Sequence, residues 1–120
     1  MTNTRERILI VEDDSAARIG LQQLVRGWGF DVETAADGEE GLERGLRTRP
    51  SLVVLDVKLP IRDGISVADA LRAHDRRRPP IVLITGTDRP EEQAQRVGAI
   101  GYLRKPFELD DLVSLVWRGV

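Results

Sequence analysis

The sequence predicts a single α/β domain in which five parallel strands alternate with five helices. The chain has 120 residues, the usual size of one domain. Short runs of Ile, Leu and Val recur along it, and stretches with helical spacing of apolar residues separate these runs. This alternation is typical of a parallel sheet covered by helices on both faces.

The expected strands are short and almost entirely apolar. The clearest cover residues 8–11, 52–55 and 81–84, and weaker ones cover 31–35 and 100–103. Parallel strands that are buried on both faces have continuous apolar runs of this kind. A charged residue directly after such a run is therefore expected at the rim of the sheet, where loops lead to the helices.

The first helix is expected between a cap at Asp14 or Ser15 and a stop at Gly29. Its spacing is helical throughout, because the apolar residues recur every three or four positions. They are Ala17, Leu21, Leu24, Val25 and Trp28.

A second helix is expected to start from a cap at Asp37 and to run to about Arg47. Its apolar face carries Leu42 and Leu46. Two glycines inside it should each cost about 1 kcal/mol relative to alanine, so we expect a pliable helix. These are Gly41 and Gly45.

The last three helices are less uniform. Asp63 opens the third, Asp88 followed by Pro90 opens the fourth, and the fifth begins near Glu108. The fourth has few apolar anchors, so we expect it to be lightly held. The expected apolar positions of the third helix are Ile65, Ala68 and Leu71, and those of the fourth are Ala94 and Val97. Those of the fifth are Leu109, Leu112, Val113 and Val116.

Polar residues follow the strands at one edge of the expected sheet. Right-handed crossovers place the carboxyl ends of all parallel strands at one edge, where open sheets bind ligands. In the flavodoxin-like order 2-1-3-4-5 the first and third strands are neighbours, which brings Glu12 and Asp13 beside Asp56. Thr85 ends the fourth strand and Lys105 ends the fifth, so both are expected at the same edge.

These residue types indicate metal and phosphate chemistry. Crowded carboxylates repel one another unless some are protonated or a cation holds them, and we favour the cation. Since the donors are all oxygens, with no His or Cys nearby in the sequence, a hard ion such as Mg²⁺ is expected. Asp56 could then attack phosphorus to form an acyl phosphate, with Thr85 offering a hydroxyl and Lys105 a cation. Among the 18 Lys and Arg residues only Lys58 and Lys105 are lysine, which suggests that a compact ammonium is required at position 105.

Over essentially its full length, residues 1–120, the chain resembles the receiver domain of a bacterial two-component response regulator. Four segments carry the resemblance. They are ILIVEDD at 8–14, LVVLDVKLPIRDG at 52–64, Thr85-Gly86, and GAIGYLRKPF at 98–107.

The resemblance implies a role for each site residue. Asp56 is the phosphoacceptor, and the expected Mg²⁺ ligands are Asp13, Asp56, the backbone carbonyl of Lys58, and Glu12 through water. The phosphoryl group is held by Thr85, Gly86 and Lys105. Thr85 and Tyr102 form the switch, which reshapes the face of the fourth helix, fifth strand and fifth helix. The Lys105–Pro106 peptide bond is expected to be cis.

The implied function is a phosphorylation-controlled signalling switch, with self-phosphorylation and dephosphorylation as its only activities. Two alternatives stay open. A Mg²⁺-dependent phosphohydrolase acting through an aspartyl phosphate would carry D-x-D, but Lys58 holds the second position and a substrate cap has no room. An unphosphorylated binding module would be expected to lose one of Asp13, Asp56, Thr85 or Lys105, and all four are present.

The expected partners follow from the same resemblance. They are a sensor histidine kinase or phosphotransfer protein and an effector of unknown type, with dimerisation on phosphorylation and a role in transcription regulation as further expectations. A net charge of −2 argues against direct nucleic-acid or membrane binding. The N-terminus resembles neither a signal peptide nor a membrane span, so a cytoplasmic location is expected. Both a stand-alone receiver and a fragment of a longer regulator fit the sequence.

Overall fold

The computed structural model describes residues 5–120, so residues 1–4 of the expected domain lie outside the described part. Strands and helices alternate strictly. The strands are β1 (Arg7–Val11), β2 (Asp31–Ala35), β3 (Leu52–Asp56), β4 (Ile81–Thr85) and β5 (Gly101–Arg104). The helices are α1 (Ser15–Gly27), α2 (Gly38–Thr48), α3 (Gly64–His74), α4 (Pro90–Val97) and α5 (Leu109–Gly119).

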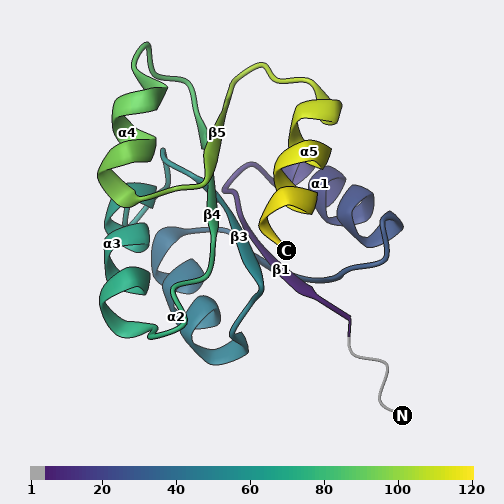
Figure 1. Ribbon diagram of the computed structural model, residues 1–120, viewed down its shortest axis with the longest axis horizontal. Helices are drawn as coiled ribbons and strands as arrows, with labels where there is room; N and C mark the ends of the chain where they lie inside the picture. The colour runs from purple at the N-terminus through teal and green to yellow at the C-terminus, as the bar shows by residue number, and fades with distance from the viewer. Residues whose placement is uncertain (1–4) are drawn as a thin grey trace.

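All strand pairs are parallel, and the sheet order is β2-β1-β3-β4-β5. This confirms the predicted doubly wound, flavodoxin-like fold. In Figure 1, α1 and α5 cover one face of the sheet, and α2, α3 and α4 cover the other. Within residues 5–120, no helix combines the length and apolar character needed to cross a membrane.

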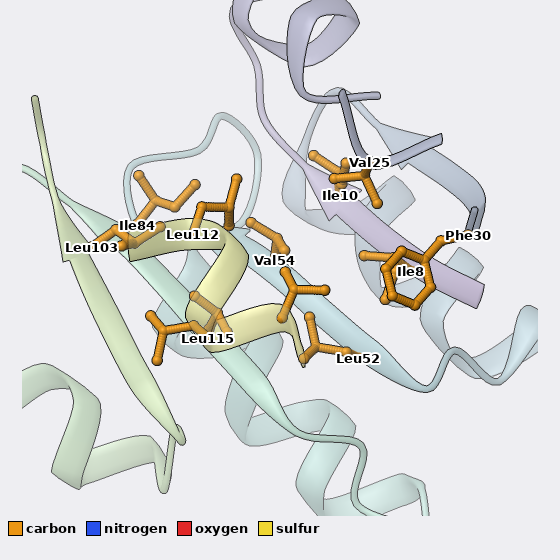
Figure 2. Close-up of a cluster of buried hydrophobic side chains, with 12 residues drawn as sticks. Ile8, Ile10, Val25, Phe30, Leu52, Val54, Ile84, Leu103, Leu112 and Leu115 are labelled. Carbon is orange, nitrogen blue, oxygen red and sulfur yellow. The ribbon is translucent and has the colours of Figure 1, made fainter. Parts of the chain in front are cut away.

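The central strands are buried on both faces, because their alternating side chains enter two separate apolar clusters. Ile8 and Val54 point toward α1 and α5, where Leu112 packs against the sheet, as Figure 2 shows. Leu9 and Val53 point to the opposite face, toward α2 and α3. The continuous apolar runs of the sequence are explained by this double burial.

Side-chain caps fix the starts of three helices. In each, an aspartate just before the helix accepts a hydrogen bond from a backbone N–H three residues later, as predicted. Asp14 accepts from Ala17 at 2.8 Å, Asp37 from Glu40 at 2.8 Å, and Asp63 from Ser66 at 2.9 Å.

Some details of the helix predictions were wrong, and Leu46 of α2, expected on an apolar face, is 38% exposed. Asp88 does not cap α4: the helix starts after Arg89 without a side-chain cap, and the Asp88 carboxylate pairs with Arg104 at 3.3 Å. Leu109 is 54% exposed because it lies in the first turn of α5, beyond the part that packs on the sheet. Leu115, which the expected apolar face omitted, is buried instead.

The two glycines of α2 have a packing role. A Cβ on Gly41 would lie 2.8 Å from Val11 Cγ1, and one on Gly45 would lie 2.8 Å from Leu71 Cδ2. Real Cβ atoms do not approach other atoms this closely. The glycines therefore allow α2 to pack tightly against β1 and α3.

We expect Gly41→Ala to destabilise the domain by about 1–3 kcal/mol, because overpacking outweighs the gain in helix propensity. Gly20→Ala in α1 is the matched control. Since nothing lies within 4 Å of its added methyl group, it should stabilise the domain by about 0.5–1 kcal/mol. Urea unfolding measures both effects, and stabilisation by both substitutions would contradict the packing argument.

Candidate functional site

Three carboxylates meet at the carboxyl edge of the sheet. The β1–β3 register places Val11 beside Leu55, so that Glu12 and Asp56, the next residues, are neighbours. Glu12 and Asp56 are buried, with 3% and 2% of their surfaces exposed, and Asp13 is exposed. Each of the three offers an oxygen within 4.8 Å of the others, as the strand order predicts.

Two donors hold the Asp56 carboxylate. Lys105 Nζ donates to Oδ2 at 2.6 Å, and the backbone N–H of Lys58 donates to Oδ1 at 3.1 Å. The same ammonium lies 3.6 Å from Glu12 Oε1. Lys105 directly follows β5, whose register with β4 also brings it next to Thr85. Strand pairing therefore delivers the cation to the acidic cluster.

This environment shifts the pKa values of the two buried acids in opposite directions. Burial, together with the interaction with the adjacent, negatively charged Asp56 carboxylate, raises the pKa of Glu12 to about 8. Burial also acts to raise the pKa of Asp56, but the interaction with the adjacent Glu12 side chain and the hydrogen bonds from Lys105 and the Lys58 N–H outweigh it and lower that pKa. At neutral pH without a metal, Asp56 is therefore the charged acid, which is the form a nucleophilic carboxylate needs.

The donor set fits a hard divalent cation. Among the described residues, Glu12 Oε2 is a buried oxygen without a hydrogen-bond partner. A buried polar atom of this kind is costly unless a ligand satisfies it. All three carboxylates supply oxygen atoms, which Mg²⁺ prefers. The site therefore suits Mg²⁺ chemically.

The hydroxyl of Thr85 lies at the same edge but has partners other than Asp56. Thr85 ends β4 and is buried. Its Oγ1 donates to Gln93 Oε1 at 2.8 Å and accepts from the Thr87 N–H at 3.2 Å. The following Gly86 is exposed. Sequence reasoning missed Gln93, since no spacing or residue type singled it out.

Tyr102 lies in β5, half-buried, and its hydroxyl donates to Glu91 Oε1 at 2.8 Å. Both expected switch residues thus contact α4. The Lys105–Pro106 bond is cis, as the resemblance implies.

Arg18 is a second residue that sequence reasoning missed. Its guanidinium donates to the backbone carbonyls of Glu12 and Asp13 at 3.0 and 3.2 Å. Arg18 lies near the start of α1, soon after the acidic pair. A basic side chain at this position was the only feature of the sequence that could have indicated its contact with the acidic loop. Arg18 therefore braces the loop that carries two of the three acids.

The fold and the site together define a class of protein. A buried aspartate ends the central strand of a 2-1-3-4-5 sheet, with an acidic pair, a lysine and a threonine on neighbouring strands. This is the arrangement of a receiver domain. The sequence model described as "Response regulator receiver domain" matches residues 8–117, so the chain belongs to this family.

Similar proteins agree with this membership. The transcriptional regulatory protein PrrA of Mycobacterium leprae is 43% identical over 111 residues, which is 92% of this chain and 48% of the relative. The chain thus spans about half the length of this curated relative.

Two solved structures are close in fold. Chemotaxis protein CheY4 of Vibrio cholerae superposes with a TM-score of 0.86 at 27% identity, covering 98% of this chain and 100% of that one. The receiver domain of a sensor histidine kinase of Pseudomonas aeruginosa, solved with a magnesium ion in its active-site cleft, has a TM-score of 0.86 at 29% identity. That match covers 97% of this chain and 98% of the other.

Proposed function

We propose that this receiver domain is a switch controlled by phosphorylation of Asp56, with a histidine kinase or phosphotransfer protein as the donor. One observation carries the proposal. Asp56 is a buried carboxylate, held by the Lys105 ammonium at 2.6 Å in a cluster of oxygens that suits Mg²⁺. Crowded, polarised carboxylates of this kind are typical of functional sites.

The proposed reaction is a phosphoryl transfer. An Asp56 carboxylate oxygen forms a bond to phosphorus, while the bond from phosphorus to the donor's imidazole nitrogen breaks and its electron pair stays on the imidazole. Lys105 neutralises charge that develops on the phosphoryl oxygens. Mg²⁺, when bound, supplies further neutralisation. We assign its ligands as Asp13, Asp56, the Lys58 carbonyl, and Glu12 through water.

The proposed response starts from Thr85 and Tyr102. Thr85, with Gly86 and Lys105, is assigned to bind the phosphoryl oxygens, and Tyr102 is assigned to turn inward. Both hydroxyls donate to residues of α4 in the present structure, so their movement would release bonds to that helix. The surface of α4, β5 and α5 would then change, which is a common form of switching.

The proposed partners are a kinase on the input side and an effector domain or protein on the output side. The name of PrrA and the half-length match support a receiver that works within a transcription regulator. We assign nucleic-acid binding to such an effector and not to this domain. Dimerisation on phosphorylation and a cytoplasmic location remain predictions.

Intact-protein mass spectrometry tests the proposal. Incubation with acetyl phosphate and Mg²⁺ should add one phosphoryl group, with acetate as the leaving group. Chelation of the metal should prevent it, because the acidic cluster then lacks its neutralising cation. Failure to form an adduct under any condition would favour an unphosphorylated binding module, and steady phosphate turnover would favour a phosphohydrolase.

A further inference from the structure

The first turn of α4 binds both proposed switch residues through their hydroxyl groups. Thr85 Oγ1 donates to Gln93 Oε1, and the Tyr102 hydroxyl donates to Glu91 Oε1, each at 2.8 Å. Both acceptors therefore belong to one helix. Both donors belong to neighbouring strands of the sheet. In this structure, the helix thus holds both hydroxyls.

The Thr85 hydroxyl can serve only one acceptor at a time, because a hydroxyl carries one proton. Its oxygen accepts from the Thr87 N–H at 3.2 Å, and its proton goes to Gln93. Thr85 is only 2% exposed, so solvent has little access to this hydroxyl. For Thr85 to donate to a phosphoryl oxygen on Asp56, its bond to Gln93 must break.

We propose that Gln93 is a positioning residue that competes with the phosphoryl group for the proton of the Thr85 hydroxyl, and so favours the unphosphorylated state. The inference rests on the proposed function of Asp56 and adds a residue that opposes the switch. No covalent bond changes in the exchange. One hydrogen bond from Thr85 to Gln93 is replaced by one from Thr85 to the phosphoryl oxygen, and the half-buried Gln93 amide turns to water.

Helix α4 is suited to this role because it is short and has few buried residues. It spans only Pro90–Val97, and its start has no side-chain cap. Its buried residues are Pro90, Ala94 and Val97. A helix with so few apolar contacts is stabilised noticeably by single side-chain hydrogen bonds, and elements of low local stability are the ones that move in switches.

Beryllofluoride, a noncovalent mimic of the phosphoryl group, tests the proposal. Its affinity in saturating Mg²⁺ is measured by isothermal titration calorimetry for the wild type and for Gln93→Leu. We expect the variant to bind beryllofluoride about three- to tenfold more tightly. This factor corresponds to the net free energy of one neutral hydrogen bond, here the Thr85–Gln93 bond that stabilises the state without beryllofluoride. The affinity for Mg²⁺ alone should not change, because Gln93 is not among the proposed metal ligands. Gln93→Ala should also bind beryllofluoride more tightly than the wild type. Because alanine is small, this second variant shows whether poor packing of leucine affects the result for Gln93→Leu.

Three controls separate competition from a general effect on the helix. Gln95→Leu makes the same change at an exposed position of α4 whose side chain has no hydrogen bond within the described part of the chain. It should leave the beryllofluoride affinity at the wild-type value. Gln93→Glu keeps an acceptor for Thr85 and should not tighten binding. In a Thr85→Val background, Gln93→Leu should have no effect, since the shared hydroxyl is gone.

Unchanged affinity in Gln93→Leu and Gln93→Ala would overturn the inference. Equal tightening in Gln95→Leu, or tightening that persists in the Thr85→Val background, would overturn it too. If the wild type bound no beryllofluoride in the presence of Mg²⁺, the proposed function itself would fail. The two failures are therefore distinguishable.

Discussion

Asp56→Asn is expected to abolish the phosphoryl adduct formed with acetyl phosphate and Mg²⁺. The amide lacks the charged oxygen that attacks phosphorus, while its size leaves the packing of β3 intact. Loss of a nucleophile lowers covalent catalysis on the order of 10³-fold or more. Intact-protein mass spectrometry over a time course measures the yield of adduct.

Asp69→Asn is the matched control for this variant. Asp69 is exposed on α3, so the same change of charge occurs away from the acidic cluster. The control should form the adduct like the wild type. An Asp56→Asn protein that keeps its circular dichroism spectrum and still accumulates the wild-type amount of adduct would contradict the assignment of the phosphoacceptor.

The second large effect is expected from Lys105→Met. Its ammonium lies 2.6 Å from Asp56 Oδ2 and 3.6 Å from Glu12 Oε1, and methionine keeps much of the side-chain length without the charge. Removal of one donor to a developing oxyanion typically costs about 10²–10³-fold in rate, and we expect phosphorylation to slow by that factor. The affinity for Mg²⁺ should rise several-fold, because a positive charge leaves the acidic cluster.

The opposite signs of these two effects make Lys105→Met informative. Arg104→Met is the control, because it removes the same charge one residue earlier, where the side chain pairs with Asp88. Phosphorylation and Mg²⁺ affinity should both stay near wild type in that control. If Lys105→Met phosphorylated at the normal rate, or if it lost Mg²⁺ affinity, Lys105 would not have the role assigned to it.

The sheet and the acidic cluster could be predicted because both depend on strong, local signals. Continuous apolar runs occur where strands are buried on both faces, and the residue after each run marks the sheet edge. Once the strand order is assumed, Glu12, Asp56 and Lys105 have to converge. Their contacts in the structure follow from strand register.

The hydrogen-bond partners of the Thr85 and Tyr102 hydroxyls could not be predicted, because they depend on how α4 is rotated and placed. Thr85 was assigned to the phosphoryl group, yet its proton goes to Gln93 in this structure. The Asp88 cap was wrong for a related reason. The Asp88 carboxylate could bond either to the start of α4 or to Arg104. It pairs with Arg104 because β5 lies close to it, and the sequence does not show this position.

Helix α2 shows a further limit of sequence reasoning. Helix propensity gives Gly41 and Gly45 a cost, and from this we expected a pliable helix. The structure places both against side chains of other elements, so their small size permits close packing. Propensity describes a residue in an isolated helix, and the contacts of α2 with β1 and α3 are invisible to it.

Chemical mapping of the phosphorylated residue tests the central claim most directly. Borohydride reduces an acyl phosphate and thereby marks the acceptor carbon, which peptide mass spectrometry then locates. We predict a mark at Asp56 in the Leu52–Asp56 strand segment, present only after incubation with acetyl phosphate and Mg²⁺. A mark at Asp13 or Glu12, or an adduct that resists borohydride and so is not an acyl phosphate, would contradict the account.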